Sequence, residues 1–564
     1  MSPQILPTTT AGISPEQFSD NLFFARNGWV AVIFLAVFIV IGFSLRAFDL
    51  GAESLSEDEL NKLETVNEYR TYGLSGKNGE HPFLMKGMQT VSIIAAENIN
   101  NFVDSPRLNV SEEAALRFPV ALFGTFITLL IYLLISELFD RSTALFSAAL
   151  WAVEPMAVGF DRIAKEDSLV LFFFLLTFVF WIRGQTAAER GNANWTWYAW
   201  AAAASFAGLM ASKYYPHLLA VVGAYYIIFQ YIPETKWRME SVRWVKFFAV
   251  MGVTFLILNP TILLPETWRE MLKFSSENRI GHDSYEFMGT LYRNQMTAWL
   301  AGVPWTFYYV FIAVKTSLLT VMLFLIGMPM MFRRRMGDGR FFIFFWAFMW
   351  FMPFTFLGGK FTRYFTLVEP LLLIIAAVGF CWSVKWISGK LFGDSRVGSI
   401  VQVILFAAVI AFPLGNSLSV SPHFRMFTNS IGGGMASAGS YFPHDEFYDA
   451  ATRQIVAKLA EKTKPGAVVA VETTTLFEYY ARKTGRDDLA FISLSDKEKV
   501  AALRPGDYVV VAKGRRYFSN AAYIDYLERS ATPSDEVSIL NTIAGEIYQL
   551  NEATVAEIQT IAKR

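Results

Sequence analysis

Long apolar runs dominate the chain up to about residue 420, and a mixed pattern of apolar and polar positions follows. A helix that crosses a bilayer needs roughly 20 apolar residues. The pattern predicts a polytopic α-helical membrane protein of about eleven spans, although three of the runs are short and a count that differs by one or two stays open. The runs centre on 30–48, 117–136, 143–158, 168–183, 197–212, 215–232, 244–264, 306–332, 341–357, 366–384 and 398–416.

Basic residues gather in every second loop between these runs, and cytoplasmic loops are normally the ones enriched in lysine and arginine. We therefore predict a multi-pass protein of the cell membrane, with its N-terminus in the cytoplasm and its C-terminal region outside. The first span is interpreted as an uncleaved anchor. The predicted cytoplasmic bases are Arg141, Arg183, Arg190, Lys236, Arg238, Arg243, Arg333, Arg334, Arg335, Arg340, Lys385, Lys390 and Arg396.

The apolar pattern divides the chain into three parts. Residues 1–29 form a cytoplasmic segment, 30–419 a transmembrane domain, and 420–564 an extracytoplasmic domain. The transmembrane domain has two large outer loops, at 49–115 and 265–305. Helical spacing of apolar residues predicts helices at 56–72 and 82–102 in the first loop, lying along the membrane surface.

Strand-like and helix-like segments alternate in the C-terminal part, which predicts an α/β domain with a mostly parallel sheet. We assign this domain a recognition or structural role. The expected helices are 445–462, 474–483 and 520–529, and the expected strands are 467–471, 489–494, 507–512, 537–540 and 546–550.

Composition narrows the class of protein further. Hydrophobic residues make up 54% of the 564 residues, too many for a soluble protein of this length. The formal net charge is zero, so bulk charge gives no reason to expect a nucleic-acid partner. The single cysteine, Cys381, cannot form an internal disulfide.

An acidic triplet, Glu57-Asp58-Glu59, follows closely after the first span, and the same loop contains His81 and Lys86. Carboxylates near hydrocarbon are costly, so their presence at the rim of a bundle indicates a site. Adjacent residues on a helix point about 100° apart, so one of Asp58 and Glu59 can face a cavity. Burial there should raise the pKa of the base. The alternative is that these charged residues belong to a solvated loop and have no chemical role.

Two further clusters lie between predicted spans. Arg162 and Glu166 are four apart and would pair on one face of a helix. Asp167 begins the fourth span, where the helix dipole favours a carboxylate; alternatively, it shares a cavity with Asp58. His282-Asp283 are interpreted as a solvated pair, because two residues are too few to indicate a metal site.

Cations also occur on the predicted outer side, where the positive-inside rule disfavours them. Lys360 and Arg363 are three apart and can face one anionic group, for which guanidinium geometry suits phosphate. Lys213 interrupts another apolar run on the same side. Snorkelling to lipid headgroups is the alternative for all three. An acid–base group, phosphate-binding cations and a cavity are what sugar transfer from a lipid phosphate requires.

These motifs resemble the GT-C glycosyltransferases, and especially the protein O-mannosyltransferases with their bacterial relatives and the lipid A aminoarabinose transferases. The resemblance covers most of residues 30–430. It rests on Asp58-Glu59, the His81-Pro82-Phe83-Leu84-Met85-Lys86 segment, Arg162 to Ser168, Lys213-Tyr214, and Lys360 to Pro370. Phe83, Met85, Lys165 and Glu166 depart from the family pattern, which puts the acceptor in doubt more than the chemistry.

The resemblance implies an inverting transfer of a sugar, with mannose as a candidate, from a polyprenyl-phosphate donor to a hydroxyl. Asp58 would be the general base and Glu59 would help to place the acceptor; which of the two is the base stays open. Lys360 and Arg363 would bind the donor phosphate. The cavity would be lined by His81, Lys86, Arg162, Asp167 and Lys213.

Several alternatives stay open. The acceptor can be protein serine or threonine, a lipid, or a glycan of the cell envelope. A transporter of lipid-linked sugars would show paired halves, and we find no internal repeat. A membrane anchor that presents the C-terminal domain would leave Lys360 and Arg363 unexplained. No motif indicates a cofactor, and a divalent metal is an open alternative.

Overall fold

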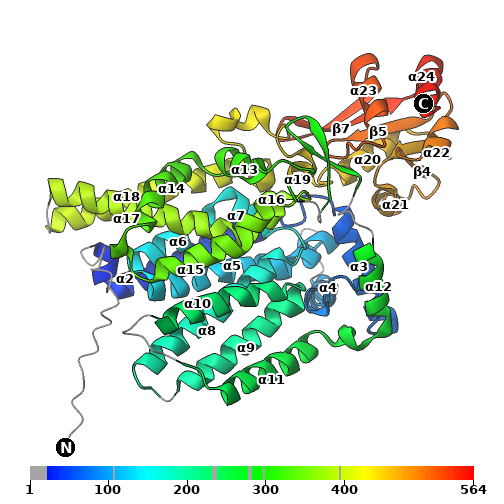
Figure 1. Ribbon diagram of the computed structural model, residues 1–564. Helices are drawn as coiled ribbons and strands as arrows, with labels where there is room; N and C mark the ends of the chain where they lie inside the picture. Colours follow the sequence, from blue (N-terminus) through cyan, green and yellow to red (C-terminus); the bar gives the residue numbers. More distant parts are fainter. Residues whose placement is uncertain are drawn as a thin grey trace, which may run out of the picture.

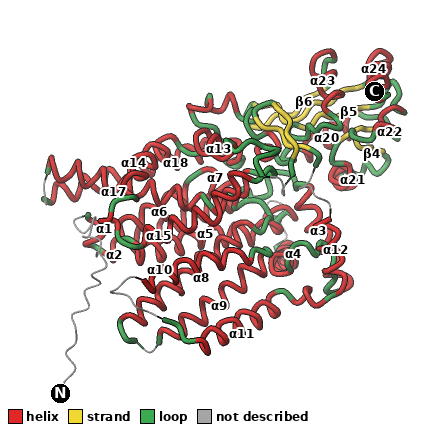
Figure 2. Tube along the Cα trace, viewed as in Figure 1, coloured by secondary structure: helices red, strands yellow, loops and turns green. Residues whose placement is uncertain are grey.

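A long bundle of helices carries a small α/β domain at one end (Figure 1). Among the residues that the structure describes, strands occur in this domain and in a hairpin beside it (Figure 2). The computed structural model describes residues 22–563, except 104, 106–107, 193, 232–237, 277–281, 296–298 and 393–394. Residues 1–21 of the predicted cytoplasmic segment therefore lie outside the described residues, as does Lys236.

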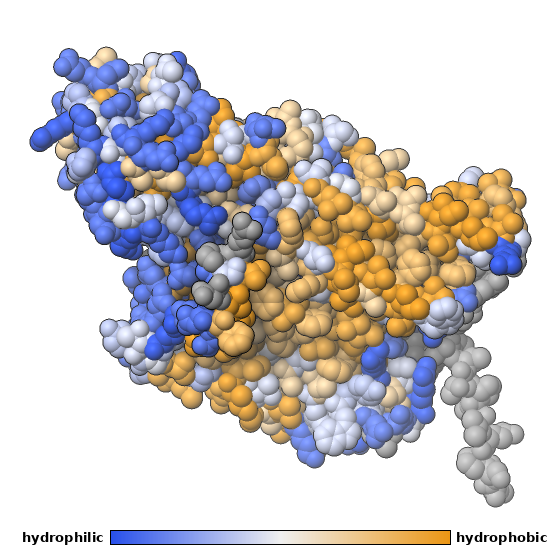
Figure 3. Space-filling view, turned by 180° about the vertical axis from the view of Figure 1, so that it is seen from behind, coloured by the Kyte–Doolittle hydropathy of each residue, from blue (hydrophilic) through white to orange (hydrophobic). Residues whose placement is uncertain are grey.

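Seven helical segments within the described ranges are long and apolar enough to cross a membrane. The polytopic helical fold class is thus confirmed. A broad apolar surface covers the bundle when it is viewed from behind, with the polar α/β domain at one end (Figure 3). The segments are α2 (Gly28–Ala47), α5 (Glu112–Leu138), α8 (Asp167–Glu189), α11 (Ser241–Leu258), Gly339–Phe356, α17 (Glu369–Leu391) and α18 (Arg396–Val420).

The other expected spans fall on shorter or broken helices. Pro155 begins α7, separated from the end of α6 by one residue, and Pro216 lies shortly before α10. A proline ring fits the first turn of a helix but not the interior, so it divides a long apolar run into separate helices. Segment Gly339–Phe356 contains a π-helical turn at Ala347–Phe351 between α15 and α16. The shorter helices are α6 (Arg141–Val153), α7 (Pro155–Phe160), α9 (Trp195–Ser212), α10 (Leu219–Tyr231), α13 (Phe307–Lys315), α14 (Leu318–Met331), α15 (Gly339–Trp346) and α16 (Met352–Phe356).

The two helices predicted in the first outer loop are confirmed as α3 (Glu57–Tyr72) and α4 (Phe83–Phe102). The second loop contains α12 (Pro265–Ser276) and an antiparallel hairpin of β1 (Ser284–Phe287) and β2 (Thr290–Arg293). Helix α3 and the hairpin lie at the end of the bundle that carries the α/β domain (Figure 1).

The C-terminal sheet has the order β4-β3-β5-β7-β6, in which β3 is parallel to β4 and β5. Strand β7 is antiparallel to β5 and β6, so the prediction of a mostly parallel sheet is wrong. The antiparallel direction of β7 results from the tight hairpin that joins it to β6. Leu540 and Asn541 form the turn of this hairpin, and both adopt positive φ. The strands are β3 (Val468–Val471), β4 (Ala490–Ser493), β5 (Tyr508–Ala512), β6 (Asp535–Ile539) and β7 (Thr542–Gln549).

The single helix predicted over 445–462 is wrong, because the chain breaks between α19 and α20. Tyr448 and Asp449 have φ of 44° and 62°, in the left-handed region. This break turns both side chains toward the bundle, where they meet residues of α3. The helices of the domain are α19 (Pro443–Phe447), α20 (Thr452–Lys462), α21 (Thr474–Lys483), α22 (Lys497–Ala501), α23 (Ala521–Ser530) and α24 (Glu552–Ala562).

Hydrogen bonds fix the α/β domain to the loop before α3. The Ser54 backbone N–H and hydroxyl both donate to the carbonyl of Ala450, at 3.1 and 2.9 Å. The Tyr480 hydroxyl accepts from the Leu55 N–H at 2.7 Å. The start of α3 is therefore held between the bundle and the domain.

Candidate active site

A cavity of about 800 Å³ lies where α3, the segment before α8, the 3-10 helix Thr362–Leu367 and the α/β domain meet. The predicted site residues Asp58, His81, Lys213 and Arg363 line it. The cavity also receives side chains from the β1–β2 hairpin and from the segment that follows β5. It therefore brings together residues from both predicted outer loops and from the C-terminal domain.

Asp58 lies in the first turn of α3 and contacts three groups across the cavity. Its carboxylate is 2.7 Å from the Lys165 ammonium and 3.6 Å from the Arg363 guanidinium. The Tyr448 hydroxyl donates to it at 2.8 Å. The side chain keeps 39% of its surface exposed, so a substrate can reach the carboxylate.

The pKa of Asp58 departs from its ordinary value in the direction opposite to our prediction. Burial alone would raise it, but the charges of Lys165 and Arg363 together with two hydrogen bonds hold the pKa well below its usual range. The prediction of a raised pKa is wrong because it considered burial without these cations. Asp58 is ionised at neutral pH.

Glu59 points away from the cavity, and the structure does not bring it to the acceptor side. A capping box joins its carboxylate to Ser56 at the start of α3. Arg117 binds the same carboxylate through two nitrogens at 2.8 and 2.7 Å, and the Ala164 N–H donates to it at 2.8 Å. Every one of these contacts is structural, and the side chain is buried.

Arg363, Asp167 and Lys213 form a second charged group beside Asp58. The Lys213 ammonium lies 2.9 Å from one oxygen of Asp167, and the Arg363 Nε lies 3.9 Å from the other. Asp167 begins α8 and is buried, so it positions both cations rather than lining the cavity. The structure therefore does not place Asp167 in the cavity with Asp58, although Arg363 contacts both carboxylates.

The segment between α7 and α8 is a series of turns, so the predicted helical pair of Arg162 and Glu166 does not form. Arg162 donates instead to the carbonyls of Leu45, Arg46, Phe48 and Asp49 at the end of α2, at 2.7–3.1 Å, and does not line the cavity. Glu166 pairs with Lys62. His81 Nδ1 lies 3.6 Å from the Glu166 carboxylate, and burial holds the pKa of His81 well below its usual value.

Lys86 and Lys360 are buried away from the cavity. The Lys86 ammonium donates to the carbonyls of Lys77 and Asn78, at 3.3 and 2.7 Å, and burial lowers its pKa to about 7. Lys360 donates to the carbonyls of Val303, at 3.0 Å, and Leu357. The structure therefore places Arg363 at the cavity but not its predicted partner Lys360.

One wall of the cavity comes from the α/β domain. Arg515 pairs with Asp449 and with Glu57, whose carboxylate also lies 3.3 Å from Nε2 of His282. The His282 ring stacks on Tyr517, with centroids 4.1 Å apart and an interplanar angle of 15°. His282 and Asp283 are thus engaged with separate partners, since Asp283 accepts from backbone N–H groups after Tyr517.

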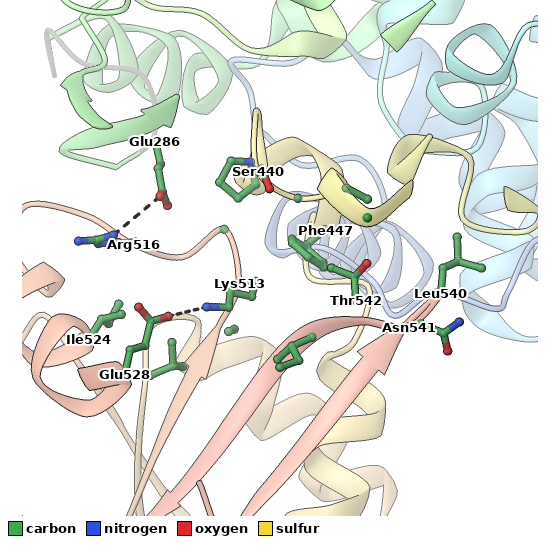
Figure 4. A pocket seen from close by; sticks show the side chains of 18 of the residues that line it. Glu286, Ser440, Phe447, Lys513, Arg516, Ile524, Glu528, Leu540, Asn541 and Thr542 are labelled. Carbon is green, nitrogen blue, oxygen red and sulfur yellow. Dashed lines mark hydrogen bonds and ion pairs between the residues drawn. The ribbon is translucent and has the colours of Figure 1, made fainter. Parts of the chain in front are cut away.

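A second cavity of about 850 Å³ lies behind this wall, between the β5–β7 end of the sheet and residues 435–447. Figure 4 shows that its charged side chains are paired: Arg516 faces Glu286, and Lys513 faces Glu528. The two cavities are separated by only a few residues of chain, because Arg515 and Tyr517 face one of them while Arg516 faces the other.

Sequence reasoning missed Lys165, Tyr448 and Arg515 as site residues. Lys165 departs from the family pattern, and its position in a loop between two apolar spans is the sequence signal that marks it. No local signal marks Tyr448 or Arg515, which reach the cavity through the tertiary fold. Across the described ranges, no group of three or more His, Cys, Asp or Glu side chains is placed to hold a metal ion.

Comparisons with known proteins identify the fold. The protein-family model "Dolichyl-phosphate-mannose-protein mannosyltransferase" matches residues 106–263. The search of curated proteins found no match. The structure resembles ArnT from Cupriavidus metallidurans in the apo state, with 15% identity, 95% of this chain and 99% of ArnT covered, and a TM-score of 0.51.

Two ligand-bound structures show the same likeness. ArnT from Cupriavidus metallidurans bound to undecaprenyl phosphate matches with 15% identity, 93% and 99% coverage of the two chains, and a TM-score of 0.50. AglB, the oligosaccharyltransferase of Archaeoglobus fulgidus, in complex with an inhibitory peptide and a dolichol-phosphate, matches with 11% identity, 87% and 70% coverage, and a TM-score of 0.50. The fold is therefore that of the GT-C glycosyltransferases, as the resemblance in sequence implied.

Proposed function

We propose that this protein is an inverting glycosyltransferase that moves a sugar from a polyprenyl-phosphate donor to an acceptor hydroxyl on the extracytoplasmic side of the cell membrane. The observation that carries the proposal is an ionised, partly exposed Asp58 next to a group of cations in one cavity. The matched mannosyltransferase family model and the ArnT fold, seen elsewhere with undecaprenyl phosphate, support it.

The proposed reaction is a single displacement. The acceptor hydroxyl gives its proton to Asp58 while its oxygen forms a bond to the anomeric carbon of the sugar. The bond between that carbon and the phosphate oxygen breaks, and the electron pair leaves with the lipid phosphate. One displacement inverts the anomeric configuration.

The cations that would hold the leaving phosphate are Arg363, Lys165 and Lys213. Each lines the cavity, and each is paired with Asp58 or Asp167 in this structure. A bound phosphate would compete with these carboxylates for the same cations. Because the cations are what lower the pKa of Asp58, phosphate binding would raise that pKa and make Asp58 a stronger base when the donor is in place.

The proposal extends to the identity of the donor sugar and the class of the acceptor. Mannose is the first donor sugar to test, because the matched family model is that of dolichyl-phosphate-mannose-protein mannosyltransferases. The acceptor classes are a protein hydroxyl and the hydroxyl of a lipid or envelope glycan.

A reconstituted transfer assay with defined polyprenyl-phosphate sugars tests the proposal. Asp58→Asn should lower the transfer rate by about 10²–10⁴-fold, the usual contribution of a general base, while donor binding is kept. Asp488→Asn is a matched control, because Asp488 pairs with Arg486 on the surface of the α/β domain. Transfer by the Asp58→Asn protein at the parent rate would remove Asp58 as the base.

A further inference from the structure

The wall that the α/β domain contributes has the features of a sugar-binding surface. The His282 ring is covered on one face by Tyr517, which is buried, while His282 itself keeps 28% of its side-chain surface exposed. The Glu57 carboxylate is 39% exposed and lies 3.3 Å from the ring nitrogen. A flat ring with an accessible carboxylate at its edge is thus presented to the cavity.

The His282 ring and the Glu57 carboxylate together match the chemistry of a pyranose. The C–H face of a sugar ring is apolar and packs on an aromatic ring, whose burial and stacking are both favourable. The hydroxyls at the sugar's edge are donors, and an ionised carboxylate offers only acceptors. Arg515, at 3.3 Å from the same carboxylate, fixes its orientation.

The wall is rigidly supported from behind. Gly514 has φ +86°, and a Cβ there would lie 2.5 Å from the Pro443 carbonyl oxygen, so only glycine permits this close packing. Arg515 is anchored by Asp449, and Arg516 pairs with Glu286 on the side of the second cavity (Figure 4). Support of this kind lowers the ordering cost of binding.

The position of this wall in the cavity favours contact with the acceptor rather than with the donor. Glu57 and Asp58 are neighbours in the first turn of α3, with side chains about 100° apart. Asp58 contacts the cations proposed to hold the donor phosphate, whereas Glu57 contacts His282 and Arg515. We propose that Glu57, His282 and Tyr517, oriented by Arg515, form a subsite for a saccharide unit of the acceptor. This inference rests on the proposed function and narrows it to a sugar-bearing acceptor.

Saturation-transfer NMR on the full-length protein in detergent tests binding without turnover, with the methyl glycosides of glucose, galactose and mannose as probes. The parent should transfer saturation to ring C–H protons of at least one glycoside. His282→Ala should remove roughly nine tenths of the binding, while His282→Phe keeps a flat ring and should retain most of it. His217→Ala is the matched control, because His217 stacks on Trp350 outside the cavity lining.

A binding signal that is absent in the parent, or equal in the parent and His282→Ala, would overturn the subsite. Turnover separates this failure from failure of the proposed function. With a saccharide acceptor, His282→Ala should raise the acceptor KM about tenfold and leave the donor KM unchanged. Efficient transfer to a serine–threonine peptide, with an acceptor KM that His282→Ala does not alter, would uphold the transferase but reject the saccharide subsite. No transfer by the parent to any acceptor would count against the transferase itself.

Discussion

At the scale of single residues, the proposed base is also the partner of the cations that would bind the donor. Asp58 is shared by Lys165, Arg363 and Tyr448, and Asp167 is shared by Lys213 and Arg363. The charges compensate each other across the cavity, which keeps several buried ions tolerable before a substrate arrives. The donor phosphodiester, which carries one negative charge, would change this balance at Arg363 first, since Arg363 contacts both carboxylates.

The lowered pKa of Asp58 predicts the acid limb of the pH–rate profile. Asp58 must lose its proton to act, so kcat/KM of the parent should stay level down to about pH 4. Lys165→Met removes the nearest cation but keeps the burial, so its acid limb should move to higher pH. The same linkage gives Asp58 a stabilising contribution that is present above its unfolded pKa and is lost as pH falls through the folded pKa. An acid limb unchanged in Lys165→Met would show that Asp58 does not limit the reaction.

Arg363 and Lys360 should behave differently when they are truncated. Arg363→Ala removes a cation from the cavity and should raise the donor KM with little change in the unfolding temperature. Lys360→Met leaves the carbonyls of Val303 and Leu357 without their donor, which should cost about 1–3 kcal/mol of stability and leave the donor KM unchanged. Donor kinetics and thermal unfolding in detergent measure both effects. A raised donor KM in Lys360→Met, with normal stability, would return Lys360 to the phosphate site.

The sequence located the charged motifs but could not give the direction of each side chain. Asp58 and Glu59 are neighbours of similar type, and Glu59 is held inward by Ser56 in the capping box and by Arg117 and Ala164, which are far away in the chain. Lys86 is predicted to line the cavity and Lys360 to bind the donor phosphate, yet both are buried away from the cavity. A buried lysine that binds carbonyls has the same local sequence pattern as one that binds a ligand. Tertiary contacts make this distinction.

At the scale of elements, the first turn of α3 is the part that most directly positions the site. The capping box fixes where the helix begins, and the buried Glu59–Arg117 pair fixes how it is rotated. Three acidic residues in this turn also face the positive end of the helix dipole. Rotation of α3 would move Glu57 and Asp58 together.

The Glu59–Arg117 pair should therefore be a stability determinant that acts on activity only indirectly. Glu59→Ala and Arg117→Ala should each lower the free energy of unfolding by about 3–5 kcal/mol, because each leaves a buried charge without its partner. The double variant should lose less than the sum of the two, and a double-mutant cycle by unfolding in detergent measures that difference. Additive losses would mean that the two side chains do not act as a pair.

Element positions were predicted well where the hydrophobic pattern is long and regular. Each expected span falls on a helix or on a pair of helices, and α21 matches its prediction of 474–483. The errors arise where backbone geometry interrupts a continuous pattern, as at Tyr448 and Asp449, whose left-handed conformation divides the helix predicted over 445–462. The strand expected at 546–550 corresponds to β7, but its antiparallel direction is not predicted, because the tight turn before it, Leu540-Asn541, has no glycine to mark it.

At the scale of the whole molecule, the cavity is complete only when the bundle and the α/β domain are in contact. The bundle and its loops supply Asp58, Arg363 and Lys213, while the C-terminal part supplies Tyr448, Arg515 and Tyr517. The domain therefore forms part of the cavity lining, and we propose that the recognition role predicted for it concerns the acceptor. This arrangement requires the domain and the proposed site to lie on the same side of the membrane.

Orientation in the membrane is the last prediction and concerns the whole chain. The single cysteine, Cys381, is buried, so Cys381→Ser provides a background without reactive thiols. Glu536 lies on the exposed surface of the α/β domain, and Arg334 lies in the exposed basic loop after α14, so each can be replaced by cysteine in this background. On intact cells or spheroplasts, a membrane-impermeant maleimide should label Glu536→Cys and should label Arg334→Cys only after permeabilisation, because basic loops stay in the cytoplasm. Labelling of both positions from outside would contradict the helix count, and the reverse pattern would place the proposed transfer site in the cytoplasm.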